Sequence, residues 1–73
     1  MVPPSHMRLA RILGTNLRKY RKERGLSQEA LADEVELAVT YVGQIERGQR
    51  NPTLDIVERF AKALRVKPLD LLQ

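Results

Sequence analysis

The chain has 73 residues, of which 42% are hydrophobic, so it can form one small domain with a single modest core. It has no cysteine, which excludes disulfides and thiolate metal sites, and it lacks a signal-peptide pattern and any apolar run near the ~20 residues that span a bilayer. The net charge of +4 favours a polyanionic partner, although many small basic domains have none. We therefore expect a cytoplasmic protein without membrane contact.

Residues 1–7, MVPPSHM, hold two prolines and no periodic pattern, and their Ser-His-Met ending resembles the remnant of a cleaved expression tag. We predict that these residues are disordered and that the folded domain spans residues 8–73. His6, the only histidine, falls in this segment, so we expect neither a metal site nor general-base chemistry from it.

A first helix is predicted from Leu9 to about Gly25, because apolar residues recur on one helical face. That face consists of Leu9, Ile12, Leu13, Leu17 and Tyr20. Residues 8–24 carry seven basic side chains against one acid. We predict phosphate contacts for this basic surface, Arg18 included, and a solvated surface that aids solubility is the alternative.

A second, short helix is predicted over Gln28–Val35. Ser27 is a strong N-cap residue, and Leu26 can pack on Leu31 as a hydrophobic staple. The acids of this helix face outward, so only its amino end is expected to approach phosphate. Because the helix dipole and free N–H groups attract anions there, we predict that Gln28 donates to a phosphate oxygen. An ordinary helix former at the first position is the alternative.

A third helix is predicted over Val39–Arg47, and the tight joint between it and the second indicates a helix-turn-helix. Val42 and Ile45, three positions apart, face back into the joint. The remaining residues form an outward surface that a DNA major groove can accept. They are Val39, Thr40, Gly43, Gln44 and Arg47.

The outward surface of this third helix contains groups that can contact bases. Gln44 can pair bidentately with adenine, Thr40 can donate or accept a hydrogen bond, and Val39 offers methyl groups to the thymine methyl. Gly43 weakens the helix by about 1 kcal/mol but allows close approach of the backbone to the duplex. Tyr41 lies at the edge of the apolar face, so we place its ring in the core first and its hydroxyl on a phosphate second.

Gly48 is the expected left-handed stop of the third helix, and residues 49–52 form an exit loop. Thr53 then caps a fourth helix. The predicted core stripe of that helix consists of Leu54, Val57, Phe60, Ala61 and Leu64.

Lys67-Pro68 opens a fifth, short helix with three leucines, more than one small core readily buries. We predict that Leu69 and Leu72 lie at a homodimer interface, since two-fold dimers are the usual way in which this architecture reads a palindrome. A last helix that simply closes the monomer is the alternative.

Three segments together resemble the phage-repressor DNA-binding domain, also termed Cro-like or Xre-type, over nearly the whole chain after the first few residues. The matching residues are Ser27-Gln28-Glu29 with Leu31-Ala32, Tyr41-Val42 with Gln44-Ile45-Glu46-Arg47-Gly48, and Asn51-Pro52-Thr53-Leu54. The run from Tyr41 to Leu54 is also similar to the controller proteins of restriction-modification systems. The resemblance implies an all-α fold, a compact five-helix bundle of the lambda-repressor-like DNA-binding type.

The resemblance also implies roles for individual residues. It implies that Arg21 pairs with Glu46 as a structural ion pair that ties the first helix to the third. It further implies that Arg47, Arg50 and Asn51 clasp the phosphate backbone around the exit loop. A turn residue before proline is the alternative role of Asn51.

Two positions depart from the family pattern in the turn between the second and third helices. Glu36 stands where glycine is usual, and Ala38 stands where a serine or threonine cap is usual. If Glu36 adopts a left-handed conformation, it costs about 1 kcal/mol relative to glycine.

From these features we expect a sequence-specific double-stranded DNA-binding transcriptional regulator, bacterial or phage-encoded and nucleoid-associated. We expect a homodimer on a palindromic operator that regulates its own gene, with promoter occlusion and contact with RNA polymerase both open. The alternative is a protein-interaction module of the same fold, antitoxin-like or coactivator-like. We expect no enzyme, cofactor or metal, because the chain lacks cysteine, a histidine outside residues 1–7 and a Gly-rich phosphate loop.

Overall fold

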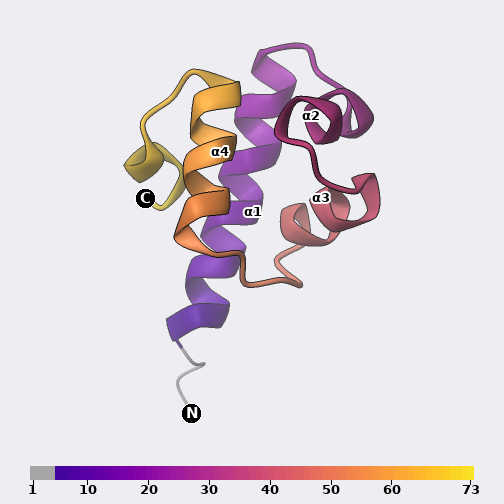
Figure 1. The fold of residues 1–73 in the computed structure, drawn as a ribbon. Helices are drawn as coiled ribbons and strands as arrows, with labels where there is room; N and C mark the ends of the chain where they lie inside the picture. Colours follow the sequence, from indigo (N-terminus) through magenta and orange to yellow (C-terminus); the bar gives the residue numbers. More distant parts are fainter. Residues whose placement is uncertain (1–4) are drawn as a thin grey trace.

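The computed structural model describes residues 5–73, and every regular element in this range is helical (Figure 1). The elements are α1 (Ser5–Glu23), α2 (Gln28–Val35), α3 (Val39–Glu46), α4 (Leu54–Leu64) and the 3₁₀ helix η1 (Pro68–Leu71). The all-α class is therefore confirmed. The prediction of five helices is wrong, because residues 5–73 contain four α-helices followed by a 3₁₀ turn.

The last element is a 3₁₀ helix because its bonds join residues three apart. The N–H of Asp70 donates to the carbonyl of Lys67 at 2.9 Å, and the N–H of Leu72 donates to that of Leu69 at 3.0 Å. Pro68 starts a helix readily at its first position, but four residues are too few to build an i to i+4 ladder.

α1 begins at Ser5, three residues ahead of the predicted domain start at residue 8. The last three residues of the predicted tag remnant, 5–7, thus belong to α1, and residues 1–4 lie outside the described residues. The assignment of residues 1–7 to a tag stays a prediction.

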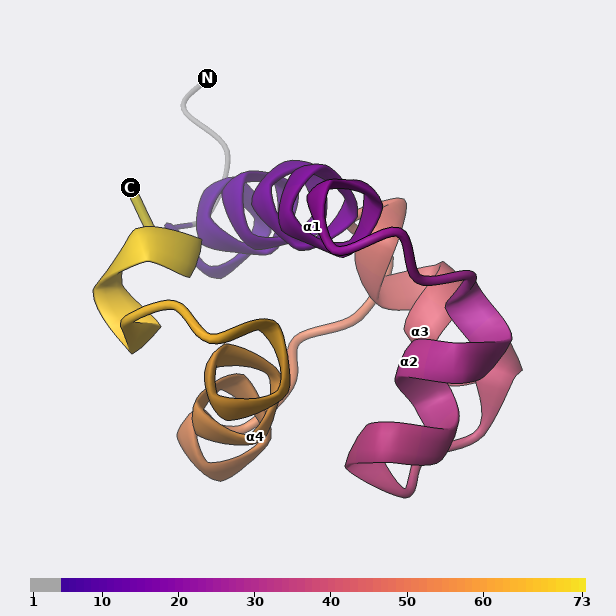
Figure 2. The ribbon, with the colours of Figure 1, turned by 90° about the horizontal axis from the view of Figure 1, so that it is seen from above.

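α1 forms the long axis of the molecule, and the other elements pack along one side of it (Figures 1 and 2). α1 contacts α3, α4 and η1, whereas α2 contacts α3 and α4. The helix pair α2–α3 lies on the opposite side of the molecule from η1 (Figure 2). Asn16 fastens η1 to α1, since its Nδ2 donates to the backbone oxygens of Leu71 and Gln73, both at 3.0 Å.

The core takes side chains from all five elements. The largest fully buried ones are Phe60, Leu17, Leu31, Ile45, Leu71, Val35 and Val42. The prediction that Leu54 belongs to the core stripe of α4 is wrong, because Leu54 is 74% exposed, and the prediction that Leu9 lies on the packed face of α1 is wrong, because Leu9 is 45% exposed. Leu54 is the first residue of α4 and extends beyond the packed part of that helix.

The buried stripe of α1 differs from the predicted apolar face for a physical reason. It runs through Ala10, Leu13, Gly14, Leu17 and Arg21. Only Leu13 and Leu17 in this stripe are large apolar residues, and Gly14 and Arg21 add nothing to a hydrophobic pattern, so the pattern could not identify them. The face is accordingly rotated away from Leu9.

Gly14 lies at a close contact between α1 and the backbone of α3. A Cβ atom built on Gly14 would stand 2.5 Å from the carbonyl oxygen of Ile45 and 2.6 Å from that of Glu46. Both are backbone atoms, which cannot rotate away as a side chain does. The missing side chain of Gly14 therefore sets the distance between α1 and α3.

The predicted helix caps are present. Ser27 accepts a hydrogen bond from the N–H of Ala30 at 3.0 Å, and Thr53 accepts one from the N–H of Ile56 at 3.3 Å. Gly48, just beyond α3, has the expected positive φ of 73°. These local signals fix where α2 and α4 start and where α3 stops.

Candidate nucleic-acid interface

The turn between α2 and α3 uses the two residues that depart from the family pattern. Glu36 is left-handed, with φ 59° and ψ 45°, so it takes the conformation that favours glycine. The N–H of Leu37 closes the end of α2 by donating to the carbonyl of Ala32 at 3.0 Å. Ala38 is the N-cap of α3 and makes no side-chain capping bond.

α3 has a buried inner face and a solvent-facing outer face. Val42 and Ile45 are fully buried in the core, as predicted. Val39 is 41% exposed, Thr40 is exposed and Gln44 is half-buried. The three side chains predicted to contact bases therefore share the outer face, and their contact with bases stays a prediction.

The prediction that Gly43 lies on the outward surface of α3 is wrong, because Gly43 is buried and two polar side chains occupy the space beside it. A Cβ atom there would lie 3.3 Å from Nη1 of Arg47 and 3.5 Å from Oε1 of Gln28. Gly43 thus makes room for these side chains. Close approach of a duplex to Gly43 stays a prediction, and it requires Arg47 and Gln28 to move aside.

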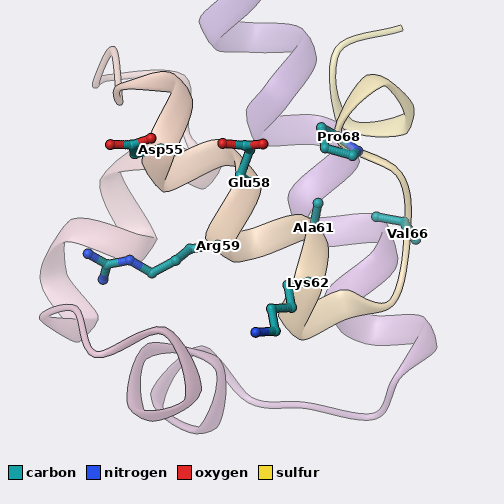
Figure 3. A pocket seen from close by; sticks show the side chains of 7 residues that line it. All are labelled: Asp55, Glu58, Arg59, Ala61, Lys62, Val66 and Pro68. Carbon is teal, nitrogen blue, oxygen red and sulfur yellow. The ribbon is translucent and has the colours of Figure 1, made fainter.

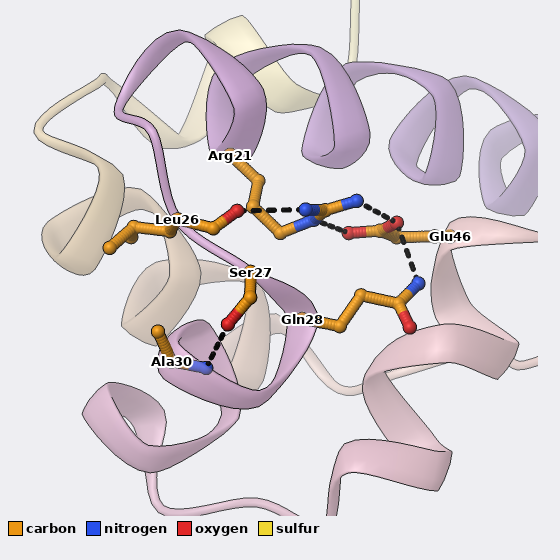
Figure 4. A network of polar contacts seen from close by, with 6 residues as sticks. All are labelled: Arg21, Leu26, Ser27, Gln28, Ala30 and Glu46. Carbon is orange, nitrogen blue, oxygen red and sulfur yellow. Dashed lines mark hydrogen bonds and ion pairs between the residues drawn. The ribbon is translucent and has the colours of Figure 1, made fainter.

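A buried polar network joins α1, α2 and α3 (Figure 4). Arg21 donates through Nε to Oε2 of Glu46 at 2.6 Å and through Nη2 to Oε1 at 3.1 Å. The two side chains are only 10% and 3% exposed. Arg21 also donates to the carbonyl oxygen of Leu26 at 2.8 Å, which holds the loop before α2. The pair implied by the resemblance therefore fastens α3 to the rest of the fold.

Gln28 joins this network, which the sequence interpretation did not anticipate. Its Nε2 donates to Oε1 of Glu46 at 3.0 Å, so the amide lies between the first turn of α2 and the last turn of α3 (Figure 4). The sequence places Gln28 directly after the Ser27 cap, at the start of α2. Its contact with Glu46 depends on how α2 and α3 cross, which the sequence alone does not show. A phosphate contact of Gln28 stays a prediction.

Two arginines near the end of α3 are bonded to neighbouring glutamines. Arg50 donates through Nε to Oε1 of Gln44 at 3.0 Å, and Arg47 donates through Nε to Oε1 of Gln49 at 3.3 Å. Both arginines are exposed.

The remaining predicted contacts are placed as follows. Arg18 and Asn51 are exposed, and Tyr41 is half-buried with its ring packed against the core. The core position of the Tyr41 ring is the first of its two expected roles. Phosphate contacts of Arg18, Tyr41, Asn51, Arg47 and Arg50 stay predictions.

Two further arginines hold the fold together. Arg24 bonds to Glu34 at 3.2 Å and to the carbonyl oxygen of Ala63, and Arg59 donates to the carbonyl oxygen of Val35 at 2.6 Å. The seven basic residues of the segment 8–24 therefore do not act as one surface, because Arg21 is buried and the half-buried Arg24, just beyond α1, is bonded to Glu34 and Ala63. The outward basic charge of α1 comes from Arg8, Arg11, Arg18, Lys19 and Lys22.

A shallow hollow lies on the exposed side of α4, beside the loop that leads to η1 (Figure 3). Its lining residues are Asp55, Glu58, Arg59, Ala61, Lys62, Val66 and Pro68. The acids stand toward the start of α4 and Lys62 toward its end (Figure 3). Leu69, which follows the last lining residue, is 65% exposed, and Leu72 is half-buried.

Two kinds of site are not found among residues 5–73. No group of three or more His, Cys, Asp or Glu side chains in that range is arranged to hold a metal ion. None of the helices described there has the length and apolar character needed to cross a membrane.

Comparison with known proteins gives consistent matches. A family model described as helix-turn-helix matches residues 17–71. The control protein C.BamHI of Bacillus amyloliquefaciens is 47% identical over 62 residues, which cover 84% of this chain and 76% of that protein. The crystal structure of the restriction-modification controller protein C.AhdI from Aeromonas hydrophila matches with a TM-score of 0.81 and 44% identity, covering 85% of this chain and 94% of that one.

A solved complex with DNA is also similar. It contains the restriction-modification controller protein C.Esp1396I as a tetramer with its natural 35 base-pair operator. The match has a TM-score of 0.77 and 35% identity, and it covers 86% of this chain and 83% of that one.

Proposed function

The chain belongs to the helix-turn-helix family and is a DNA-binding transcription regulator, and we propose that it acts as a controller protein that reads its own operator. The observation that best supports this proposal is that α3 has a buried inner face and a solvent-facing outer face. Its inner face is fixed by buried contacts, so the helix holds its outer face, with Val39, Thr40 and Gln44, in a fixed position toward the major groove. Phosphate contacts from Gln28 and from the exit loop then set the register.

We propose that the protein binds its operator as a homodimer through the side of the fold that carries η1. Leu69 exposes a large apolar side chain there, and the α4 surface beside it has acids near one end and bases near the other. In a two-fold dimer with antiparallel α4 helices, each acidic end would face the basic end of the partner. The C.Esp1396I controller, a tetramer on its operator, supports oligomeric binding.

The proposed controller acts in the cytoplasm on a bacterial or phage genome. Regulation of its own gene would follow from its concentration and its dimerisation, since the described residues 5–73 consist of the helices of one core. Occlusion of a promoter and contact with RNA polymerase are the two routes by which such binding changes transcription.

A second candidate function rests on the exposed leucines. Leu54 and Leu69 are 74% and 65% exposed, and Leu54 lines a groove together with the 45% exposed Leu9. A protein-interaction module, antitoxin-like or coactivator-like, would use that surface for another protein. The DNA-reading proposal is favoured because the family match and the polar outer face of α3 are independent of these leucines.

The test of the proposed function is selection of bound duplexes from a random DNA pool at physiological salt. We expect a palindromic winner bound on the order of 10³-fold or more above bulk DNA, with the half-site spacing of a dimer. Weak, salt-sensitive binding without enrichment would contradict sequence reading and favour the interaction module.

The test of the interface is sedimentation equilibrium of two variants. Leu69→Lys should dissociate the dimer, whereas Leu54→Lys should leave it intact. If only Leu54→Lys dissociates it, the interface lies instead on the groove lined by Leu9, Leu54 and Leu72. A wild-type protein that stays monomeric at high micromolar concentration would exclude both surfaces.

A further inference from the structure

The contact between Arg50 and Gln44 fixes which atoms of the Gln44 carboxamide are free for a base. Arg50 donates through Nε to Oε1 of Gln44 at 3.0 Å. A guanidinium carries only donors, so Gln44 has to present its oxygen to Arg50 and turn its Nε2 amide group away. Among residues 5–73, no other hydrogen bond holds the side chain of Gln44.

The exit loop brings Arg50 back to Gln44. The N–H of Gly48 donates to the carbonyl of Ile45 at 3.0 Å, and the N–H of Gln49 donates to the carbonyl of Gln44 at 2.9 Å. The left-handed Gly48 turns the chain at this point, with φ 73°. Arg50 is thus placed beside Gln44 by backbone bonds, although the two residues are six positions apart.

The orientation of the carboxamide changes the base that Gln44 can read. Adenine needs a donor for its N7 and an acceptor for its N6 amino group, so it needs both ends of a free carboxamide. Guanine presents two acceptors, N7 and O6, in the major groove. Oε1 can accept a second hydrogen bond, but its contact with Arg50 fixes the direction in which the oxygen points. The Nε2 donors are then the groups of Gln44 left to meet a base, and two donors match guanine.

We propose that Arg50 is a positioning residue that turns Gln44 into a donor-only reader of guanine, in place of the adenine contact that a free glutamine favours. The proposal rests on the proposed DNA-binding function. Arg50 retains its terminal nitrogens for a phosphate, because only Nε is used in the contact with Gln44. Arg50 would thereby contact the DNA phosphate backbone and orient the base-reading Gln44 at the same time.

The test is the guanine-to-adenine preference of four proteins on duplexes that differ at one base pair. The base pair to vary is the operator position at which the Gln44→Ala variant no longer prefers one base over the others. Wild-type protein should prefer guanine to adenine there by on the order of tenfold or more. Arg50→Met should remove this preference or reverse it toward adenine. Arg47→Met is the matched control, since Arg47 is an exposed arginine that bonds to Gln49 instead.

Arg47→Met should lower affinity for all duplexes while keeping the guanine preference, because it removes one nearby charge without freeing Gln44. Thermal melting of each variant by circular dichroism checks folding, and we expect no change because both arginines are exposed. An adenine preference in the wild type, an unchanged ratio in Arg50→Met, or a Gln44→Ala variant with unchanged preferences would overturn the proposal while leaving the DNA-binding function standing. Failure to enrich any sequence over bulk DNA would overturn both.

Discussion

The two faces of α3 are held by different kinds of contact. On the inner face, Val42 and Ile45 are fully buried, and the backbone carbonyls of the last turn pass within van der Waals reach of Gly14. On the outer face, the contacts are between the ends of long polar side chains, such as Arg50 with Gln44. The inner face therefore cannot adjust without moving a helix, whereas the outer face adjusts by side-chain rotation.

This difference separates stability from recognition along eight residues of one helix. Substitutions on the inner face should change the free energy of unfolding, and substitutions on the outer face should change DNA binding. The polar network of Arg21, Glu46 and Gln28 lies at the boundary between the two, because it is buried yet touches the helix end nearest the exit loop.

The largest expected effect is that of Arg21→Met. It leaves the carboxylate of Glu46, whose side chain is 3% exposed, with Gln28 as its remaining partner. Removing one member of a buried ion pair costs about 3–5 kcal/mol, so much of the stability of this small domain should be lost. Urea unfolding followed by circular dichroism measures the loss.

The double variant Arg21→Met with Glu46→Leu is the control for that result. It removes both charges together, and replacement of a buried pair by apolar residues is often neutral. We expect the double variant to regain most of the stability lost in Arg21→Met. If it does not, the ion pair is needed for a geometric reason that apolar packing does not supply.

Gly14→Ala should have the second largest effect. Its methyl group would lie 2.5 Å from the carbonyl oxygen of Ile45, so α1 and α3 would have to separate. Overpacking of this kind costs about 1–3 kcal/mol, which exceeds the gain of about 1 kcal/mol from replacing glycine in a helix. The readout is the urea midpoint, and an unchanged midpoint would mean that the two helices can move apart freely.

Glu36→Gly changes the turn between α2 and α3, so we expect it to alter the stability of both helices together and not one face of α3. Glu36 has φ 59°, and glycine takes this conformation without the steric cost. After the greater chain entropy of unfolded glycine is subtracted, we expect a gain of about 0.5–1 kcal/mol in stability. Glu36→Ala removes the same charge but keeps the strain, so a gain in that variant would assign the effect to charge. Sequence preference on DNA should be the same in all three proteins.

The sequence was sufficient for the features that depend on local chemistry. Ser27, Gly48 and Thr53 mark helix ends through bonds to neighbouring residues, so α2 and α4 begin and α3 ends where predicted, to within one residue. The departure at Glu36 was also visible, because the family pattern places glycine there.

The features that depend on how helices cross could not be predicted. Gly14 and Arg21 belong to the buried stripe of α1 only because α3 passes over them, and neither adds to an apolar pattern. The same limit applies to the outer face, where the contact of Arg50 with Gln44 depends on the path of the exit loop. From its residue type alone, Gln44 is expected to bind adenine. In the folded chain, the contact of Oε1 with Arg50 leaves the Nε2 donors of Gln44 to meet a base.

The smallest expected effect is that of Gly43→Ala, a glycine-to-alanine substitution within α3 itself, at a buried position covered by the side chains of Arg47 and Gln28. A methyl group there would lie 3.3 Å from Nη1 of Arg47, the mobile end of a long side chain, and not from backbone. The chain gains helix propensity of about 1 kcal/mol and loses part of it in displacing Arg47, so stability should change by less than about 1 kcal/mol, in the stabilising direction. The urea midpoints of Gly43→Ala and Gly14→Ala, measured side by side, give the difference between crowding a side chain and crowding backbone directly, because the helix propensity term is common to both. Equal losses in the two variants would mean that the side chains covering Gly43 yield no more readily than the backbone facing Gly14, and adaptation by side-chain rotation would then be wrong.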